Sequence, residues 1–523
     1  MSLLFFQGKN KKQKQNMNMD EKTIKEALLK GERVTLECKR AKSEVPKELW
    51  KTYSAFANTI GGLILLGIDE NLKEKDPSKR FQIIGVEDAQ KILTDFWNTI
   101  NSDKVSENIL TDKDVEVVDM GGKRIICIHV PMADYRMKPI YLNGNVYKGT
   151  YRRNHEGDYH CTERQVRAMV RDSFEEGNDG IMMHHYNMDD IDLDSLHRYR
   201  NHFKVRNDGH VWNEVDDKAF LKNLGGYIVD RETGEEGLSM AGLMMFGKGL
   251  PIRERFDNFR MDYINFCNLI GDERYSDRLT YDGRWENNLY QFFTIVMPKM
   301  TFDLPRPFRM EGVVRVDDTP QHKAVREAFT NAIIHADLMA DAGILRIEKH
   351  DDKLCFRNPG LLRLPIEQIY EGGNSKARNP RIQNMLRMIG FGENLGSGFP
   401  KIIAAWKETN WGEPELKNKI ELDEVELVLP ISAPKAENET VNAPVNAPVN
   451  APVNAPVKLS KTQLAIVKAI MKNKYVTYED LSSVVRAHRT TIMRNMATLK
   501  KKSVIRRVGG DKNGYWELLI DIR

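Results

Sequence analysis

Cysteine is scarce in this sequence, and the few cysteines present are scattered. None of the five lies in a C-x-x-C pair or in a Cys/His cluster with zinc-finger spacing. This pattern excludes a disulfide-built fold, argues against structural zinc, and is typical of a protein of the reducing cytoplasm. We therefore expect a cytoplasmic location. The cysteines are Cys38, Cys127, Cys161, Cys267 and Cys355.

Long apolar runs are also missing. The apolar stretch at residues 3–6 is too short for a signal-peptide core, and no later segment approaches the length of a membrane span. We therefore expect no membrane association. Residues 1–19 are mostly polar and are predicted to be a disordered leader outside the folded part.

The chain has little net charge, but the charge is unevenly spread. The 79 basic and 75 acidic residues leave a net charge of +4, too small to indicate nucleic-acid binding by the chain as a whole. Residues 458–523, however, contain fifteen Lys/Arg and only five Asp/Glu. A basic tail on a mildly acidic body predicts that the tail contacts phosphate.

The length of 523 residues predicts three or four domains, at roughly 100–200 residues per domain. The clearest break is at residues 441–457, a four-residue VNAP repeat whose regular proline predicts an extended, semi-stiff spacer. We expect a multidomain α+β chain. Its predicted parts are a leader (1–19), a first domain (20–175), a connecting domain (176–315), a third domain (316–432), a linker (433–457) and a last domain (458–523).

Residues 322–337, HKAVREAFTNAIIHAD, are predicted to form a helix because their apolar residues recur at three- and four-residue spacing. Glu327, Asn331 and His335 fall four apart on a neighbouring stripe. The amide oxygen of Asn331 can ligate Mg²⁺, and the carboxylate of Glu327 can accept a proton from a water aimed at a γ-phosphate. The alternative is a partly exposed helix with ordinary polar residues.

Two glycine-containing segments follow this helix. Residues 357–360, RNPG, end an apparent strand, and residues 390–398, GFGENLGSG, open a further helix. A glycine-rich loop before a helix lets backbone N–H groups approach phosphates. The ordered set resembles the histidine-kinase, gyrase and Hsp90-type (GHKL) ATPase fold. It resembles more closely the divergent branch found in Schlafen/AlbA-like bacterial proteins described as regulators or RecG-related helicases.

This resemblance covers about residues 320–430 and implies an α/β sandwich that binds ATP with Mg²⁺, with at most weak ATPase activity. Asn358 stands where the wider superfamily has the Asp that accepts a hydrogen bond from adenine, so this sequence departs from the family there. The implied catalytic residue is Glu327 and the implied metal ligand is Asn331. The implied nucleotide-binding residues are Asn331, Asn358, Gly360, Gly396 and Gly398.

In the first domain, alternation over residues 34–39 predicts a strand whose open face carries Glu37 and Lys39. A helix over residues 47–60 and a buried strand over 63–68 follow. Three motifs resemble the AlbA-like domain shared with Schlafen proteins. They are E-x-x-x-x-E-x-K at Glu32, Glu37 and Lys39, S-A-F-A-N-T-x-G-G at residues 54–62, and G-I-D-E at residues 67–70.

Two functions fit this domain. The first is binding of DNA or RNA through Lys148, Arg152 and Arg153, which we predict on one strand. The second is metal-dependent cleavage of RNA, implied by the resemblance to Schlafen ribonucleases. In that hypothesis Mg²⁺ or Mn²⁺ is held by acidic residues and a lysine stabilises developing negative charge. The residues concerned are Glu32, Glu37 and Asp69 as ligands and Lys39 as the cation. A third interpretation is that Glu37 and Lys39 form only an exposed ion pair.

The connecting domain contains one segment that nearly spells a phosphate-binding P-loop, GLMMFGKG at residues 242–249. Gly249 occupies the position where a P-loop needs a hydroxyl residue for magnesium. We therefore reject a P-loop helicase and predict a buried strand here. The segment also resembles the connecting region of the same bacterial family.

The last domain shows three helical segments, at residues 461–473, 478–485 and 488–504, followed by a hairpin at 504–519. This order resembles the winged helix-turn-helix of bacterial regulators. Ile492, Met496 and Leu499 should point inward. The basic charge favours DNA as the partner over a protein. The residues predicted to face DNA are Arg489, Thr490, Arg494 and Lys501.

These observations together predict a nucleotide-responsive nucleic-acid-binding protein, either a transcriptional regulator or a defence protein. The alternative is a Schlafen-like, metal-dependent nuclease acting on RNA. A third possibility is an ATPase-like domain that binds no nucleotide. Because ATPase-like domains of this type often pair, we also expect a homo-oligomer.

Overall fold

The computed structural model describes residues 20–29, 34–71, 73–74, 76–174, 177–269, 272–306, 310–311, 314–315, 318–392, 398–432, 461–485, 488–501, 504–508 and 515–518. The predicted leader and the predicted linker at 433–457 lie outside these residues. The chain divides into two compact units, Met1–Lys435 and Ala436–Arg523. Within the described residues, no helix combines the length and the apolar character needed to cross a membrane.

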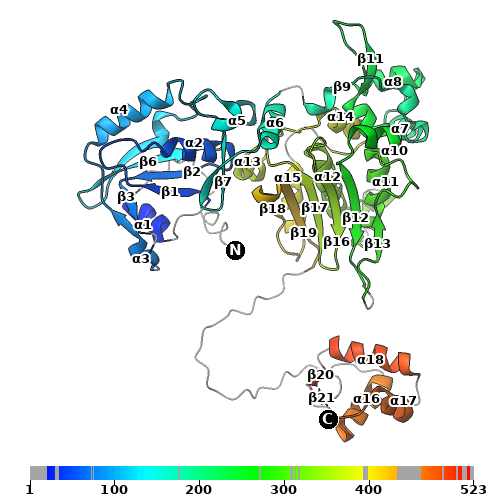
Figure 1. The fold of residues 1–523 in the computed structure, drawn as a ribbon. Coiled ribbons are helices and arrows are strands. Elements are labelled where there is room, and N and C mark those ends of the chain that lie inside the picture. Colours follow the sequence, from blue (N-terminus) through cyan, green and yellow to red (C-terminus); the bar gives the residue numbers. More distant parts are fainter. Residues whose placement is uncertain are drawn as a thin grey trace. The chain divides into compact units, whose positions relative to one another are not determined.

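The first unit begins with a four-stranded sheet that helices cover on both faces (Figure 1). Its elements are α1 (Glu21–Leu29), β1 (Leu36–Lys39), α2 (Leu49–Asn58), β2 (Gly62–Leu66), β3 (Ile68–Glu70), α3 (Pro77–Arg80), β4 (Phe81–Ile83), α4 (Ala89–Ile100), η2 (Asp112–Asp114), β5 (Val115–Asp119) and β6 (Arg124–Val130). The strand order is β1-β2-β6-β5, with β1 and β2 parallel. Ile64 and Leu66 pack with α2 and α4, whereas Leu65 packs with α1. Covered faces on both sides explain why β2 is apolar throughout.

A hairpin and a final helix complete this part. Its elements are η3 (Tyr135–Met137), α5 (Val146–Gly149), β7 (Tyr151–Asn154), β8 (Gly157–His160) and α6 (Glu163–Asp172). Asn58 donates to the backbone oxygens of Ile140 and Tyr151 at 2.8 and 3.0 Å. The S-A-F-A-N-T motif therefore fastens the hairpin to α2. A capping box begins α6, because Thr162 and Gln165 each bind the other's backbone N–H, a pair recognisable in the sequence from its three-residue spacing.

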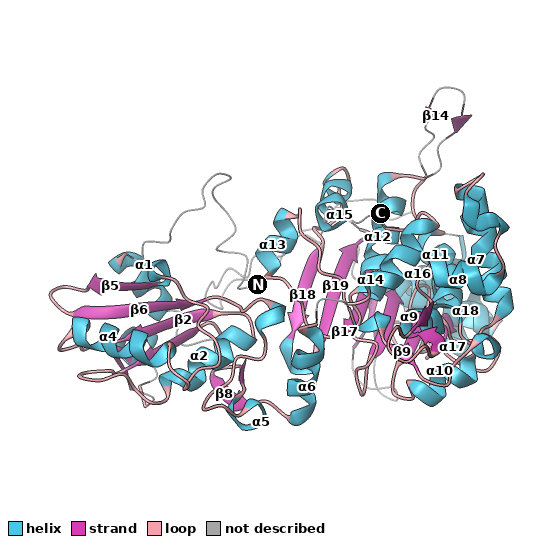
Figure 2. Cartoon of the chain, turned by 90° about the horizontal axis from the view of Figure 1, so that it is seen from above, coloured by secondary structure: helices cyan, strands magenta, loops and turns pink. Residues whose placement is uncertain are grey.

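The remainder of the first unit is built around a six-stranded sheet (Figure 2). The elements up to this sheet's central helix are η4 (Asn178–Gly180), β9 (Met182–Met183), η5 (Met188–Asp190), α7 (Leu193–Arg206), η6 (Val211–Glu214), α8 (Asp217–Asn223), β10 (Tyr227–Val229), β11 (Glu236–Ser239), α9 (Met240–Phe246), α10 (Gly249–Arg255), β12 (Arg260–Asn265), β13 (Asp277–Leu279), α11 (Leu289–Thr301), β14 (Met310–Glu311) and β15 (Val314–Arg315). The later elements are α12 (Pro320–Ile334), β16 (Ile344–Lys349), β17 (Lys353–Pro359), α13 (Ile366–Glu371), α14 (Pro380–Met388), α15 (Gly398–Lys407), β18 (Glu415–Lys419), η7 (Ile420–Leu422) and β19 (Glu424–Pro430).

The order of this sheet is β13-β12-β16-β17-β19-β18, with β12 parallel to β16. One apolar core extends from Met183 to Leu429 and includes residues of α7, α9, α11, α12 and α15. The predicted connecting and third domains therefore share one sheet and one core. The connecting region supplies two of the strands.

The segment at residues 240–249 differs from the prediction. It does not continue a strand: β11 ends at Ser239 and α9 begins at Met240. All seven residues of α9 are buried, so the run is apolar throughout. Its sequence therefore shows neither the spacing of a helix nor that of a strand. The deciding signal is Ser239, whose hydroxyl accepts a hydrogen bond from the backbone N–H of Gly242 at 3.1 Å and caps the helix.

The second unit contains three helices and an antiparallel hairpin. They are α16 (Lys461–Lys472), α17 (Tyr478–Val485), α18 (Arg489–Lys501), β20 (Ile505–Val508) and β21 (Tyr515–Leu518). Ile492, Met496 and Leu499 have no exposed surface, so their predicted inward orientation is confirmed. They pack with residues of α16, α17 and the hairpin in one small core.

Candidate functional site

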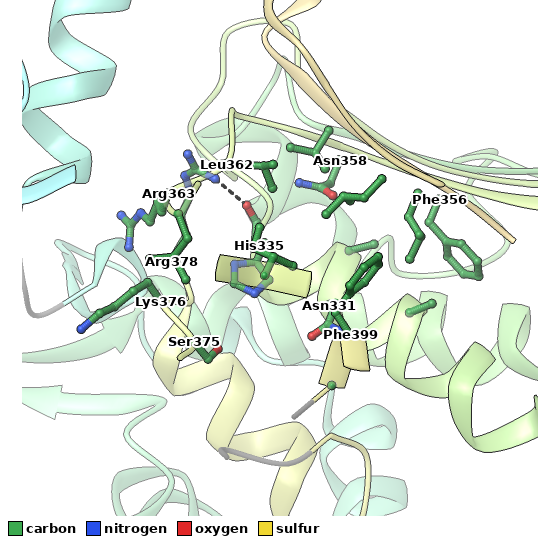
Figure 3. A pocket seen from close by; sticks show the side chains of 18 of the residues that line it. Asn331, His335, Phe356, Asn358, Leu362, Arg363, Ser375, Lys376, Arg378 and Phe399 are labelled. Carbon is green, nitrogen blue, oxygen red and sulfur yellow. Dashed lines mark hydrogen bonds between the residues drawn. The ribbon is translucent and has the colours of Figure 1, made fainter. Parts of the chain in front are cut away.

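The polar stripe of α12 forms part of a pocket in the first unit. Thr319 caps the helix, accepting from the backbone N–H of His322 at 3.3 Å, and Pro320 follows at the first helical position. The amide of Asn331 donates to Glu327 Oε1 at 3.3 Å. Glu327, Asn331 and His335 all line the pocket, on the one stripe that their four-residue spacing predicted. Figure 3 shows Asn331 and His335 there.

The opposite wall of the pocket comes from the core face of the six-stranded sheet. Phe356 and Asn358 of β17 lie there with Val425 and Leu427 of β19. Asn358 is almost fully buried, with 4% of its surface exposed. A largely apolar wall with a few buried polar groups is the usual form of a site for a small planar ligand. The structure therefore brings Glu327, Asn331 and Asn358 together around one cavity.

The three glycines predicted to bind nucleotide differ in whether the structure places them at the pocket. A Cβ on Gly398 would lie 2.1 Å from Glu327 Oε1 and 3.2 Å from Asn331 Nδ2, so a larger residue would displace the Glu327 side chain from its present position. Gly398 lines the pocket, whereas Gly360 is not one of the described residues that line it. Gly360 has a φ of +92°, and its Cβ would meet Arg378 at 2.9 Å. The predicted nucleotide contact of Gly360 stays a prediction. Gly396 lies outside the described residues.

A basic wall that the sequence did not reveal completes the pocket. Arg363, Lys376 and Arg378 line it, and Figure 3 shows Arg363 and Arg378 on the side of His335. Arg378 donates to the backbone oxygens of His335 and Leu361 at 2.8 and 2.7 Å. Burial, together with the charges of Arg378 and Arg363, lowers the pKa of His335 to about 3. The imidazole facing the pocket is therefore neutral at physiological pH.

This basic wall is bound to α6, the helix that follows the β7–β8 hairpin. Asp172, at the end of α6, accepts hydrogen bonds from Arg363 at 2.9 Å and from Arg378 at 2.8 Å. Burial raises the pKa of Asp172, but the charges and hydrogen bonds of Arg378 and Arg363 outweigh it and lower the pKa to about 2. Arg171 forms a second connection, 2.5 Å from Asp337 just after α12.

The residues of the predicted acidic triad are placed less favourably for metal. Glu37 is not on an open face: 8% of it is exposed, and its two oxygens lie 2.5 Å from Lys39 and 2.8 Å from Arg153. Asp69 lies on β3, paired with Gln82. Among the described residues, no metal-binding group of three includes Glu37 or Asp69. Glu32 lies outside the described residues, so the complete triad stays a prediction.

Two of the three basic residues predicted to contact nucleic acid are buried, and that prediction is wrong for both. Arg153 is 1% exposed, bridges Glu37 and Asp158, and stacks over Phe56 at 5.1 Å. Arg152 is 9% exposed and bonds to Asp423 at 2.9 Å. Lys148 is exposed, but on the short helix α5 and not on their strand. Consecutive residues of β7 are buried on both faces of the strand, and nothing in the sequence indicates this.

In the second unit, the outer face of α18 carries the residues predicted to meet DNA. Arg489, Thr490 and Arg494 are all exposed. Arg489 makes a loose contact with Glu479 at 3.5 Å, which is an exposed pair of little energetic weight. Lys501 is the last residue of α18, and its side chain lies outside what the structure describes.

Comparison with family models identifies three regions of the chain. Residues 32–162 match "Schlafen, AlbA_2", and residues 344–429 match "Putative ATP-dependent DNA helicase recG C-terminal" (HATPase_c_4). Residues 167–262, which include the C-terminal part of α6 and all of α9, match a domain of unknown function, DUF8451. The Schlafen AlbA_2 domain and the RecG-related ATPase-like domain are thus confirmed, the second over residues that follow α12.

Two solved structures show distant similarity. A crystal structure of a protein from Corynebacterium diphtheriae has 15% identity and a TM-score of 0.37, covering 94% of this chain and 98% of that one. The N-terminal domain of a RecG-related protein from Nitrosomonas europaea has 24% identity and a TM-score of 0.22, covering 28% and 94%. No curated protein matches. The chain is thus a multidomain α+β protein that carries a Schlafen AlbA_2 domain and a RecG-related ATPase-like domain.

Proposed function

We propose that this chain binds nucleic acid and that a nucleotide in the α12 pocket controls the binding. The observation that carries the proposal is the double role of Arg363 and Arg378. Both line the pocket, and both bind Asp172 of α6. A ligand that moves either arginine therefore also acts on the position of α6, the helix that directly follows the AlbA_2 match.

The proposed ligand is an adenine nucleotide with Mg²⁺. The amide oxygen of Asn331 is a suitable ligand for a hard cation, and Glu327 beside it is a suitable acceptor for a proton from water. The closeness of Gly398 to both side chains lets a backbone segment approach the phosphates. Asn358 supplies a buried amide for the base.

Control by this ligand requires that it bind two arrangements of the chain with different affinity. The arginine pair provides a physical basis for such a difference. When Asp172 occupies the guanidinium groups, an anionic ligand meets a neutralised wall; when Asp172 withdraws, the same wall is cationic. Binding of nucleotide and seating of α6 on the wall then oppose one another.

Two surfaces are proposed to contact nucleic acid. In the second unit, the three helices and hairpin have the order of a winged helix-turn-helix, with α18 as the recognition helix. Its exposed Arg489 and Arg494 lie in the strongly basic part of the chain. In the AlbA-like region, Lys148 is exposed beside the exposed aromatic side chain of Tyr147. A role in transcription or defence, and assembly into a homo-oligomer, belong to this proposal as expectations.

Cleavage of RNA is the second candidate, because the AlbA_2 match includes Glu32, Glu37 and Asp69. The contacts of Glu37 with Lys39 and Arg153 favour binding without cleavage, since a metal ion would have to displace two cations that already neutralise this carboxylate.

The experiment that tests the proposal is calorimetric titration of the full chain with ATP and ADP, with and without Mg²⁺. We expect Asn331→Ala to weaken the Mg²⁺-dependent part of the binding. Glu327→Ala should leave binding intact and remove any hydrolysis. Lys323→Ala, an exposed change on the same helix, is the matched control. Absence of binding to the wild-type chain would refute the nucleotide part of the proposal.

A further inference from the structure

The two central strands β16 and β17 have chemically opposite faces. Leu345 and Ile347 of β16 and Leu354 and Phe356 of β17 belong to the apolar core. Because side chains alternate along a strand, Glu348 and Cys355 point to the other face, away from the pocket that Phe356 lines. Cys355 is thus a buried cysteine outside the apolar core, on a face that it shares with the charged residues Glu348 and Arg357 and with Val428, its partner on β19.

Three different donor groups converge on that face. Glu348 and Cys355 are directly paired across the two strands. His350 follows Glu348 by two residues and lies on the same face, with Nε2 3.3 Å from Glu348 Oε2. One atom from each residue, a carboxylate oxygen, an imidazole nitrogen and the thiol sulfur, all lie within 4.8 Å of one another. The two strands are rigid elements, so the hairpin itself sets this geometry.

The neighbours of the three donors hold them in place. Arg357 lies 3.2 Å from Glu348 Oε1, which leaves Oε2 for another partner, and it also lies 2.7 Å from Glu426. The ring of Phe266 stacks on His350 at 4.8 Å between centroids and 17° between planes. Cys355 and Glu348 are 2% and 6% exposed, whereas the His350 side chain is 27% exposed and gives solvent access. Such supporting contacts orient metal ligands in known sites.

We propose that Glu348, His350 and Cys355 bind one zinc-type divalent ion, with water in a fourth position. Sulfur, imidazole and carboxylate are the donor types that zinc takes, in tetrahedral geometry, and a thiolate selects against Mg²⁺. The thiolate and the carboxylate neutralise the two positive charges of the ion. The occupied site therefore does not repel the neighbouring Arg357, which keeps its contact with Glu426. Binding releases the proton of the Cys355 thiol.

The site lies on the opposite face of the sheet from the nucleotide pocket, so the inference does not depend on the proposed function. The test uses the full chain, freed of metal with a chelator and titrated with Zn²⁺ by calorimetry and with Co²⁺ by absorption spectroscopy. We expect one ion per chain, and a thiolate-to-cobalt charge-transfer band. Mg²⁺ should not compete.

Cys355→Ser should remove the charge-transfer band, and His350→Gln should weaken Zn²⁺ binding by about tenfold or more. His350→Gln changes a partly exposed side chain, so it keeps the test valid where Cys355→Ser does not fold. Cys127→Ser, a buried cysteine of the first sheet, is the matched control and should bind as the wild type does. The proposal is overturned by absence of Zn²⁺ binding to the wild-type chain, or by equal affinity of wild type and His350→Gln.

Discussion

Arg378 donates hydrogen bonds to both carboxylate oxygens of Asp172, through Nε at 3.1 Å and through a terminal nitrogen at 2.8 Å. The two residues are far apart in the chain, one at the end of α6 and the other in the wall of the α12 pocket. Arg378 is 4% exposed, so the pair is shielded from solvent. This contact makes the state of the pocket and the position of α6 interdependent.

Replacement of Asp172 by Asn should separate these two effects. It leaves two buried guanidinium groups without their carboxylate, which should lower the free energy of unfolding by about 3 kcal/mol. In molecules that stay folded, the freed basic wall should bind nucleotide about fivefold tighter or more. Calorimetric unfolding and nucleotide titration measure the two quantities. Glu163→Gln, which removes an exposed charge from the same helix, should change neither. Unchanged nucleotide affinity together with reduced stability would show that the contact is structural only.

Acid should weaken this contact within a defined range of pH. The pKa of Asp172 is lowered from 3.8 to about 2 in the folded chain, so folding favours the ionised form. The stabilisation is complete above the unfolded pKa and is lost as the pH falls from about 4 through 2, amounting to about 2 kcal/mol. The free energy of unfolding in urea, measured at pH 5 and pH 3, should fall more steeply for the wild type than for Asp172→Asn. Parallel slopes would contradict the assignment.

Gly398→Ala should block the nucleotide pocket without a change of charge. The added Cβ would lie 2.1 Å from Glu327 Oε1, so either α15 or the Glu327 side chain must move. We expect Mg²⁺-dependent nucleotide binding to weaken by about 100-fold, because the Glu327 and Asn331 geometry is disrupted. Lys401→Ala, an exposed change on α15, serves as the control. Wild-type affinity in Gly398→Ala would place the nucleotide elsewhere.

Glu37→Gln distinguishes a structural carboxylate from a catalytic one. Because Glu37 neutralises Lys39 and Arg153, its replacement should lower the free energy of unfolding by about 1–3 kcal/mol. The wild-type chain should not cleave transfer RNA in Mg²⁺ or Mn²⁺. Glu44→Gln, at an exposed position, is the stability control. RNA cleavage by the wild type that disappears in a folded Glu37→Gln protein would establish the nuclease instead.

Replacement of Arg489 and Arg494 by Ala should weaken binding of duplex DNA to the full chain. Removing one cation from a DNA phosphate lowers the slope of log K against log salt by about 0.9, so the double variant should have a slope shallower by about two units. Lys468→Ala, on the exposed side of α16, should leave the slope unchanged. Filter or fluorescence titration over a range of salt concentrations gives both values. Identical slopes would mean that α18 is not the face that meets DNA.

The sequence alone determined those features that depend on local spacing. The four-residue interval of Glu327, Asn331 and His335 places them on one stripe of any helix, and the capping pair Thr162 and Gln165 fixes where α6 begins. The inward face of α18 followed in the same way from Ile492, Met496 and Leu499. In each case the periodicity of the element is enough, because the residues concerned are neighbours along the chain.

Tertiary structure decided what depends on contacts between distant segments. Nothing in the local sequence distinguishes Arg153 from an exposed basic residue on a strand. It becomes a buried partner of Glu37 only because its hairpin packs on α2. Asp172 and Arg378 meet because α6 is seated on the pocket wall. Glu348, His350 and Cys355 converge because strand pairing sets two residues opposite one another, although their spacing in the sequence matches no zinc-finger pattern. Burial and pairing partners are properties of the whole fold, so they could not be read from the sequence of one element.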